Sequence, residues 1–195
     1  MPMKKELSEM SLQELWELFP ISLVEHNDRW EEYYQEIAGV LRKVLAAYPV
    51  VRISHIGSTA LPGIRAKNIV DVLVEVEKTA DLHEIIQTME ENGYLCMSSS
   101  AKRVSFNRGY TIHGFEEKVY HIHLRYAGDN DELYFRDYLR EHPAVAGEYE
   151  ALKLRLWKQY EHDRDAYTQG KSDFVRKWTM EGRRRKHPDS GEVIS

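Results

Sequence analysis

The stretch "SHIGSTALPGIRAKNIVDVLVEV", from Ser54 to Val76, contains the strongest indications of the fold. A β-branched run ends in Gly57 and Ser58, and a loop with the two cations Arg65 and Lys67 leads into a second apolar run. Glycine lets the backbone turn tightly and approach a ligand, and free N–H groups after such a turn favour phosphate oxygens. The pattern predicts two strands joined by a loop whose Gly57, Ser58, Arg65 and Lys67 are candidate nucleotide- or phosphate-binding residues, with an ordinary turn as the alternative.

The second apolar run contains one carboxylate, Asp71, between Val70 and Val72. A charge among β-branched residues is costly unless it is paired or binds a metal. Because side chains alternate along a strand, Asp71, Leu73 and Glu75 are expected on one face. The pattern predicts a central strand that carries a functional carboxylate.

Three histidines are candidate partners of Asp71. His121 and His123 share one face of the strand predicted in "VYHIHLRY", and His55 comes just before the Gly-Ser turn. One carboxylate and imidazoles on neighbouring strands suit a divalent cation. We therefore expect Asp71, His121, His123 and His55 to be metal ligands, while a structural role for each histidine remains the alternative.

A further cation stands near the end of the chain. Lys171 follows Gly170 close to a predicted helix start, where backbone N–H groups and an ammonium group act together on phosphate. Tyr167 is a candidate for stacking on a base. The alternatives are an exposed lysine and a tyrosine at the edge of the core.

The remaining pattern predicts helices around a few short strands. Between residues 103 and 126, "RVSFNRG" and "VYHIHLRY" are separate strands with "YTIHGFEE" between them, and "DRDAYTQGK" separates the last two helices. The expected organisation is an N-terminal helical arm over residues 1–20, a single domain over residues 21–182 and a disordered tail over residues 183–195.

Composition narrows the classes of function. The chain of 195 residues is 42% hydrophobic and 30% charged, and its 27 basic and 32 acidic residues give a net charge of −5. That balance argues against nucleic acid or a membrane surface as the partner. One cysteine, Cys96, excludes an intrachain disulfide, and neither a signal peptide nor a membrane-spanning run is found, so we expect a cytoplasmic protein.

The motifs together resemble a known family. "HIGSTALPGIRAKNIVDVLVEV", "YHIHLRY", "FRDYLREHP", "YEALK" and "DRDAYTQGKSDF" are similar to the GrpB family, a branch of the nucleotidyltransferase superfamily, over roughly residues 22–181. The resemblance implies an α/β (α+β) fold. It consists of a small mixed β-sheet of the nucleotidyltransferase type, flanked by helices, with a C-terminal helical extension.

The resemblance also implies roles for individual residues. In the superfamily a Gly-Ser pair binds nucleotide phosphates, which matches Gly57 and Ser58, and two carboxylates one residue apart hold metal ions. Asp71 matches the first carboxylate, but Leu73 stands at the second position, and the strand with His121 and His123 carries no acid. Two-metal phosphoryl chemistry needs acids to hold both cations.

Three functions therefore remain open. The first is nucleotidyl transfer from a nucleoside triphosphate to an unknown small acceptor, with Mg, Mn or Zn as the divalent metal and with Asp71 and His123 as the catalytic residues. The second is a non-catalytic member of the superfamily that binds a nucleotide or a phosphometabolite. The third is a protein without a small ligand that interacts through its C-terminal helices. The oligomeric state is left open.

Overall fold

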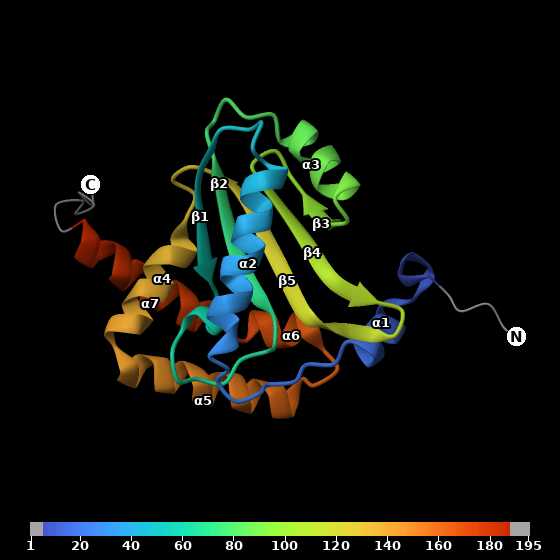
Figure 1. Ribbon diagram of the computed structural model, residues 1–195. Helices are drawn as coiled ribbons and strands as arrows, with labels where there is room; N and C mark the ends of the chain where they lie inside the picture. The colour runs from blue at the N-terminus through green and yellow to red at the C-terminus, as the bar shows by residue number, and fades with distance from the viewer. Residues whose placement is uncertain (1–5, 188–195) are drawn as a thin grey trace, which may run out of the picture.

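A five-stranded mixed sheet forms the centre of the protein, as the computed structural model of residues 6–187 shows (Figure 1). The strands are β1 (Val50–Ile56), β2 (Val70–Val76), β3 (Leu95–Ser99), β4 (Arg103–Thr111) and β5 (Gly114–Tyr126). Their order in the sheet is β1-β2-β5-β4-β3. Only the β2–β5 pair is parallel among these strands. The expected small mixed sheet of the nucleotidyltransferase type is confirmed.

Helices cover both faces of this sheet (Figure 1). The helices are α1 (Leu12–Leu18), α2 (Arg29–Val44), α3 (Leu82–Glu91), α4 (Asp131–Glu141), α5 (Pro143–Gln159), α6 (Arg164–Gln169) and α7 (Ser172–Lys186), with the short 3-10 turns η1 (Leu7–Glu9) and η2 (Ser58–Ala60). The helices α2 and α3 pack on one face. The group α4, α5 and α7 forms a second cluster beyond the other face, which confirms the C-terminal helical extension.

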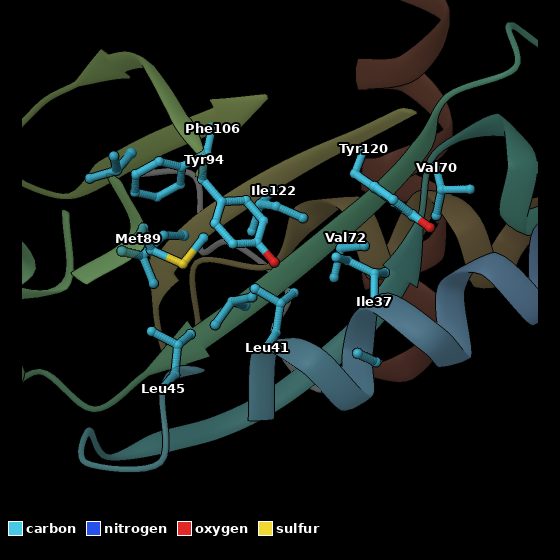
Figure 2. Packing of buried hydrophobic residues seen from close by; sticks show 14 of the residues in the cluster. Ile37, Leu41, Leu45, Val70, Val72, Met89, Tyr94, Phe106, Tyr120 and Ile122 are labelled. Atoms are coloured by element: carbon cyan, nitrogen blue, oxygen red, sulfur yellow. The ribbon is translucent and has the colours of Figure 1, made fainter. Parts of the chain in front are cut away.

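Alternation along β2 assigns its side chains to the two layers. Val70, Val72, Val74 and Val76 point into the core under α2 and α3. In Figure 2, Val72 lies beside Ile37 and Leu41 of α2, and Met89 of α3 and Phe106 of β4 lie at the other end of the same apolar layer. Burying an apolar side chain of this size contributes about 1.5–3 kcal/mol, so this layer stabilises the whole sheet.

The opposite face of β2 is polar at its ends and apolar at its centre. Asp71 and Glu75 flank Leu73, which is 0% exposed and packs with Ile56 and Leu133. The three residues share this face, as the alternation predicts. Glu75 is paired with Arg52 and is hydrogen-bonded to Asn130, so it belongs to a separate polar cluster.

Strand register places the functional candidates beside each other. In the antiparallel pair Ile56 is opposite Asp71, and in the parallel pair Asp71 is opposite His121 and Leu73 is opposite His123. The Gly-Ser turn follows Ile56 directly. Three segments that are distant in sequence therefore meet at one end of β2.

The structure corrects three sequence-based expectations. The segment "YTIHGFEE" is part of a long β4–β5 hairpin, because β4 continues to Thr111 and β5 already begins at Gly114. The segment "DRDAYTQGK" contains helix α6, which begins after a cap in which Asp163 accepts from the Ala166 N–H. Helix α7 continues to Lys186, so the first residues of the expected tail are helical and Arg183 pairs with Asp131. Residues 188–195 of that tail lie outside the described part of the chain, as do residues 1–5 of the expected arm.

Within residues 6–187, no helix combines the length and the apolar character that crossing a membrane requires.

Leu73→Asp is expected to destabilise the protein by about 3–5 kcal/mol, because it places an unpaired carboxylate in an apolar cluster. Leu73→Met, which conserves volume, is the matched control and is expected to cost under about 1.5 kcal/mol. Urea unfolding followed by circular dichroism measures both. A Leu73→Asp variant as stable as the wild type would show that residue 73 can still host a second acid.

Candidate functional site

A cavity of about 700 Å³ lies between the sheet and the C-terminal helices. Its wall combines the Gly57–Ser58 turn, the first residues of β2 and the adjoining part of β5 with residues of α4, α5, α6 and α7. The lining therefore comes from segments that are widely separated in the sequence. Side chains of Asp71, His121 and His123 lie in it together, as the strand pattern predicts.

Asp71 is the centre of a polar cluster in this cavity. Its Oδ1 atom is 3.1 Å from His123 Nε2 and 3.4 Å from His121 Nδ1. Burial tends to raise the pKa of Asp71, but the hydrogen bonds and charges of the two imidazoles outweigh it and lower the pKa far below its ordinary value. Asp71 is consequently an anion that holds both rings in place.

A second hydrogen bond extends the cluster toward helix α6. The hydroxyl of Tyr110 is 2.7 Å from His121 Nε2, and the Arg164 guanidinium lies 5.9 Å from the centre of the Tyr110 ring. Burial raises the pKa of Tyr110, so the phenol stays protonated at neutral pH. Both nitrogens of His121 are therefore engaged, which fixes the orientation of this ring.

The Gly-Ser turn passes very close to Asp71. Gly57 has a φ of +71°, and a Cβ atom added there would collide with Asp71 Oδ2. A side chain at position 57 would meet both a left-handed backbone and an occupied space. Ser58 follows this turn and hydrogen-bonds with Tyr149, whose pKa is raised to about 12 by burial and lowered in part by that bond.

Two lysines also line the cavity. The Nζ atoms of Lys67 and Lys171 lie 5.1 Å and 4.5 Å from the centre of the Tyr167 ring, respectively. Burial lowers the pKa of Lys67 to about 7, and the charges of Lys171 and Arg164 act in the same direction. Burial also lowers the pKa of Lys171 to about 8, although the charge of Asp71 opposes that shift. These amines are half-buried and repel one another, so an anion between them is electrostatically favoured.

A third lysine supports the wall from α5. Lys153 is 1% exposed, donates to the Arg65 carbonyl oxygen and lies 5.0 Å from the centre of the Tyr149 ring. Burial and, to a smaller extent, the charge of Lys171 lower its pKa to about 7. Lys153 thus joins the loop before β2 to α5 and adds positive potential to the cavity.

Two sequence candidates lie away from the cavity. Arg65 points outward and pairs with Glu25, because the loop turns its side chain away from the sheet. His55 faces the other side of β1, where it is stacked on Tyr34 and contacts Glu31 and Thr59. The structure therefore does not bring Arg65 or His55 into the cavity with Asp71. For His55 the reason is that successive residues of a strand point to opposite faces.

Sequence reasoning misses Lys153 and Arg164. Lys153 carries a signal, since it lies four residues after Tyr149 and three before Leu156, on the buried face of α5. A lysine on an apolar helix face is costly and requires a partner. Arg164 carries no such sequence signal, because the pattern of its segment indicates a loop. Its Nε atom is buried without a hydrogen-bond partner in residues 6–187.

The donor set does not fit a tightly held metal ion. In the described part of the chain, no group of three or more His, Cys, Asp and Glu side chains is arranged to hold one. One oxygen of Asp71 is shared by two imidazoles, and Leu73 fills the position of a second acid. The divalent cation therefore stays a prediction.

Comparison with known proteins gives consistent matches. The pattern of the GrpB protein family matches residues 20–181. The chain is 34% identical over 164 residues to the glutamate-rich protein GrpB of Alkalihalophilus pseudofirmus, covering 80% of this chain and 91% of that protein. It is 31% identical over 171 residues to the UPF0157 protein YqkA of Bacillus subtilis, covering 85% of this chain and 49% of that protein.

Some relatives are about twice as long as the region they share with this chain. YqkA is one, and a protein of Mycolicibacterium paratuberculosis named dephospho-CoA kinase is another, 25% identical over 182 residues that cover 80% of this chain and 44% of the relative. The chain thus spans about half the length of these two relatives.

Solved structures agree with the fold. The crystal structure of the conserved protein GrpB from Enterococcus faecalis has a TM-score of 0.72 and 29% identity, covering 85% of this chain and 99% of that one. The GLD-2/RNP-8 complex has a TM-score of 0.52 and 12% identity, covering 87% of this chain and 70% of that one. The second likeness shows the fold alone.

Gly57→Ala is expected to destabilise the protein by about 3 kcal/mol, because it adds a collision with Asp71 to the backbone strain. Gly63→Ala is the matched control. Its φ of +73° is nearly the same, but nothing lies within 4 Å of the added Cβ, so only about 1–2 kcal/mol of strain is expected. Thermal and urea unfolding of both variants give the difference. Equal losses would show that Asp71 does not constrain the turn.

Proposed function

The chain belongs to the GrpB family, and we propose that it binds a nucleotide or another phosphorylated metabolite in the cavity between the sheet and the C-terminal helices. The single observation that carries this proposal is the pair of half-buried amines in the cavity that the Gly-Ser turn also lines. Lys67 and Lys171 share the Tyr167 ring, and both line the cavity together with Ser58. An anion is the ligand that such a group favours.

The Gly-Ser turn supplies the complementary half of the site. Gly57 allows the backbone to run close to whatever the cavity holds, and the η2 turn that follows begins with Ser58. Backbone N–H groups and a hydroxyl at such a turn favour phosphate oxygens. We assign the phosphate end of the ligand to the space between this turn and the two lysines.

Asp71 and its two histidines have a positioning role in this proposal. The carboxylate is too well paired to attract a cation, and it holds the imidazoles at the floor of the cavity. His121 is engaged at both ring nitrogens by Asp71 and Tyr110, whereas His123 contacts Asp71 through Nε2 and keeps Nδ1 for a hydrogen bond to a ligand. Loss of the carboxylate is expected to weaken binding without affecting the core under α2 and α3.

The relatives suggest which ligands to test first. One relative is named for a kinase of dephospho-CoA, a phosphate-bearing metabolite, and this chain matches less than half of it. We therefore include dephospho-CoA and CoA beside the common nucleoside phosphates.

Nucleotidyl transfer is the second candidate function. The specific observation in its favour is that Asp71, the match to the first superfamily carboxylate, lies in the same cavity as the Gly-Ser turn. Incubation of the protein with each nucleoside triphosphate and Mg²⁺, Mn²⁺ or Zn²⁺, followed by chromatography for released pyrophosphate, tests it. Turnover that disappears in Asp71→Asn would establish this second function.

Lys171→Met is expected to weaken binding of nucleotides by about tenfold or more, because a charge-assisted contact to phosphate is lost. Lys177→Met is the matched control. It removes an exposed lysine of α7 that lies over Trp178, outside the cavity lining, and affinity is expected to stay within about twofold. Isothermal titration with AMP, ADP, ATP, dephospho-CoA and CoA measures the affinities, with thermal shift as a first screen. If none of these ligands binds the wild type, the proposal is wrong.

Binding is also expected to depend on pH. The pKa values of Lys67 and Lys171 are lowered to about 7 and about 8, so at pH 9.5 both amines are neutral in the free protein. A phosphate ligand must then bind together with at least one proton, and affinity for ADP should fall by at least about fivefold to tenfold per pH unit between pH 8 and 9.5. Titrations in two buffers of different ionisation enthalpy measure the proton uptake. An affinity that is constant over this range would contradict the role of the amines.

A further inference from the structure

We infer that the cavity accepts a ligand with two or more linked phosphoryl groups and neutralises it with Lys67, Lys171 and Arg164 in place of a divalent cation. This inference rests on the proposed function and specifies its ligand. In nucleotidyltransferases, as the family resemblance implies, metal ions held by paired carboxylates balance the phosphate charge. Here Lys67, Lys171 and Arg164 line the same cavity as Asp71.

The three cations form one group on the cavity wall. Two of them contact the ring of Tyr167, a side chain that is 1% exposed and therefore fixed in position. Arg164 begins α6, the helix that carries Tyr167, and its charge acts on Lys67. Lys67 and Lys171 contact a tyrosine of α6, and Arg164 is the first residue of that helix. The spacing of the three cations is therefore set before a ligand binds.

The positive charge in this group exceeds what the nearby acids balance. Four basic side chains line the wall, since Lys153 joins Lys67, Lys171 and Arg164, and Asp71 is the one anion among them without a basic partner from Lys or Arg in the described residues. The other lining acids have arginines of their own, since Asp131 pairs with Arg183 and Glu132 lies 3.8 Å from Arg125. A single phosphate carries at most two charges, whereas a diphosphate or triphosphate carries about three or four, which matches the surplus better.

The carboxylates that would hold a metal are missing from the same cavity. Leu73 is fully buried against Ile56 and Leu133 at the second position, and β5 presents His121 and His123 where a third acid would stand. A single shared carboxylate oxygen leaves Mg²⁺ with too few hard oxygen ligands. Lysines and an arginine perform the electrostatic part of that role without a coordination geometry.

The buried nitrogen of Arg164 is a second, independent observation. Its Nε atom has no hydrogen-bond partner among the described residues, although the side chain lines the cavity. An unsatisfied buried donor on a charged group is costly, and a phosphate oxygen becomes its acceptor when the Arg164 side chain shifts toward the ligand, since the Nε atom is shielded in the free protein.

The test compares phosphate ligands in the presence of EDTA and of Mg²⁺. Isothermal titration of the full chain uses orthophosphate, pyrophosphate, tripolyphosphate, AMP and ADP, so that inorganic and nucleoside sources of the diphosphate group are distinguished. With EDTA, pyrophosphate or ADP is expected to bind at least about tenfold tighter than orthophosphate or AMP, and Mg²⁺ is expected to leave that affinity unchanged or to weaken it.

Two variants and a matched control test which cations bind the linked phosphoryl groups. Lys67→Gln and Arg164→Gln are each expected to reduce affinity for pyrophosphate in EDTA by about tenfold. Arg65→Gln removes a cation two residues from Lys67 that pairs with Glu25 outside the cavity, and it should stay within about twofold of the wild type. Circular dichroism and melting temperature verify the fold of each protein, and since Arg164 and Lys67 lie on different elements, one variant remains informative if the other does not fold.

The outcomes separate this inference from the proposed function. Binding that appears only with Mg²⁺ overturns the inference and leaves the proposed function intact. Equal affinity for orthophosphate and pyrophosphate overturns the requirement for linked phosphoryl groups. Absence of binding by every phosphate ligand, with and without metal, overturns both.

Discussion

The contact of Asp71 with the two histidines of β5 organises the whole site. It exists because β2 and β5 run parallel and in register, with Asp71 opposite His121 and Leu73 opposite His123. The same carboxylate limits the Gly-Ser turn, since its other oxygen occupies the space that a side chain at position 57 would need. One ionised group thus fixes the floor of the cavity, the orientation of two rings and the path of the turn.

The cavity combines this paired carboxylate with amines that are poorly satisfied in the free protein. The pKa of Lys67, of Lys153 and of Lys171 is lowered to about 7, about 7 and about 8, so the folded protein binds fewer protons than the unfolded chain between those values and the ordinary pKa of about 10.4. Stability therefore rises with pH across that interval, and the charged amines oppose folding below it. Buried amines whose charge opposes folding are typical of a site that is organised for a ligand, because a bound anion compensates their charge.

The family and the fold do not by themselves determine the chemistry. The chain has the fold of the GrpB family, yet residue 73 of β2, where the superfamily resemblance implies a second carboxylate, is a leucine that is part of an apolar cluster. A lost acid that had become a surface polar residue could be restored by one substitution. Leu73, which is packed between Ile56 and Leu133, cannot be replaced by an acid in this way, because a charge there would have neither water nor a partner.

Local patterns in the chain are enough to predict the sheet, its flanking helices and the central position of Asp71. Alternation of apolar and polar residues and the glycine and serine after β1 are local signals, and they place Asp71, His121 and His123 on their faces without knowledge of the fold. The choice of cations at the site, in contrast, comes from packing between distant elements. The direction of a loop side chain such as Arg65, the burial of Lys153 and the approach of Arg164 depend on how α5 and α6 pack against the loop before β2, and no local pattern encodes that packing. His55 shows that closeness in sequence does not place a side chain in the site. It lies two residues before Gly57, but the alternation of side chains along β1 turns it to the opposite face of the sheet.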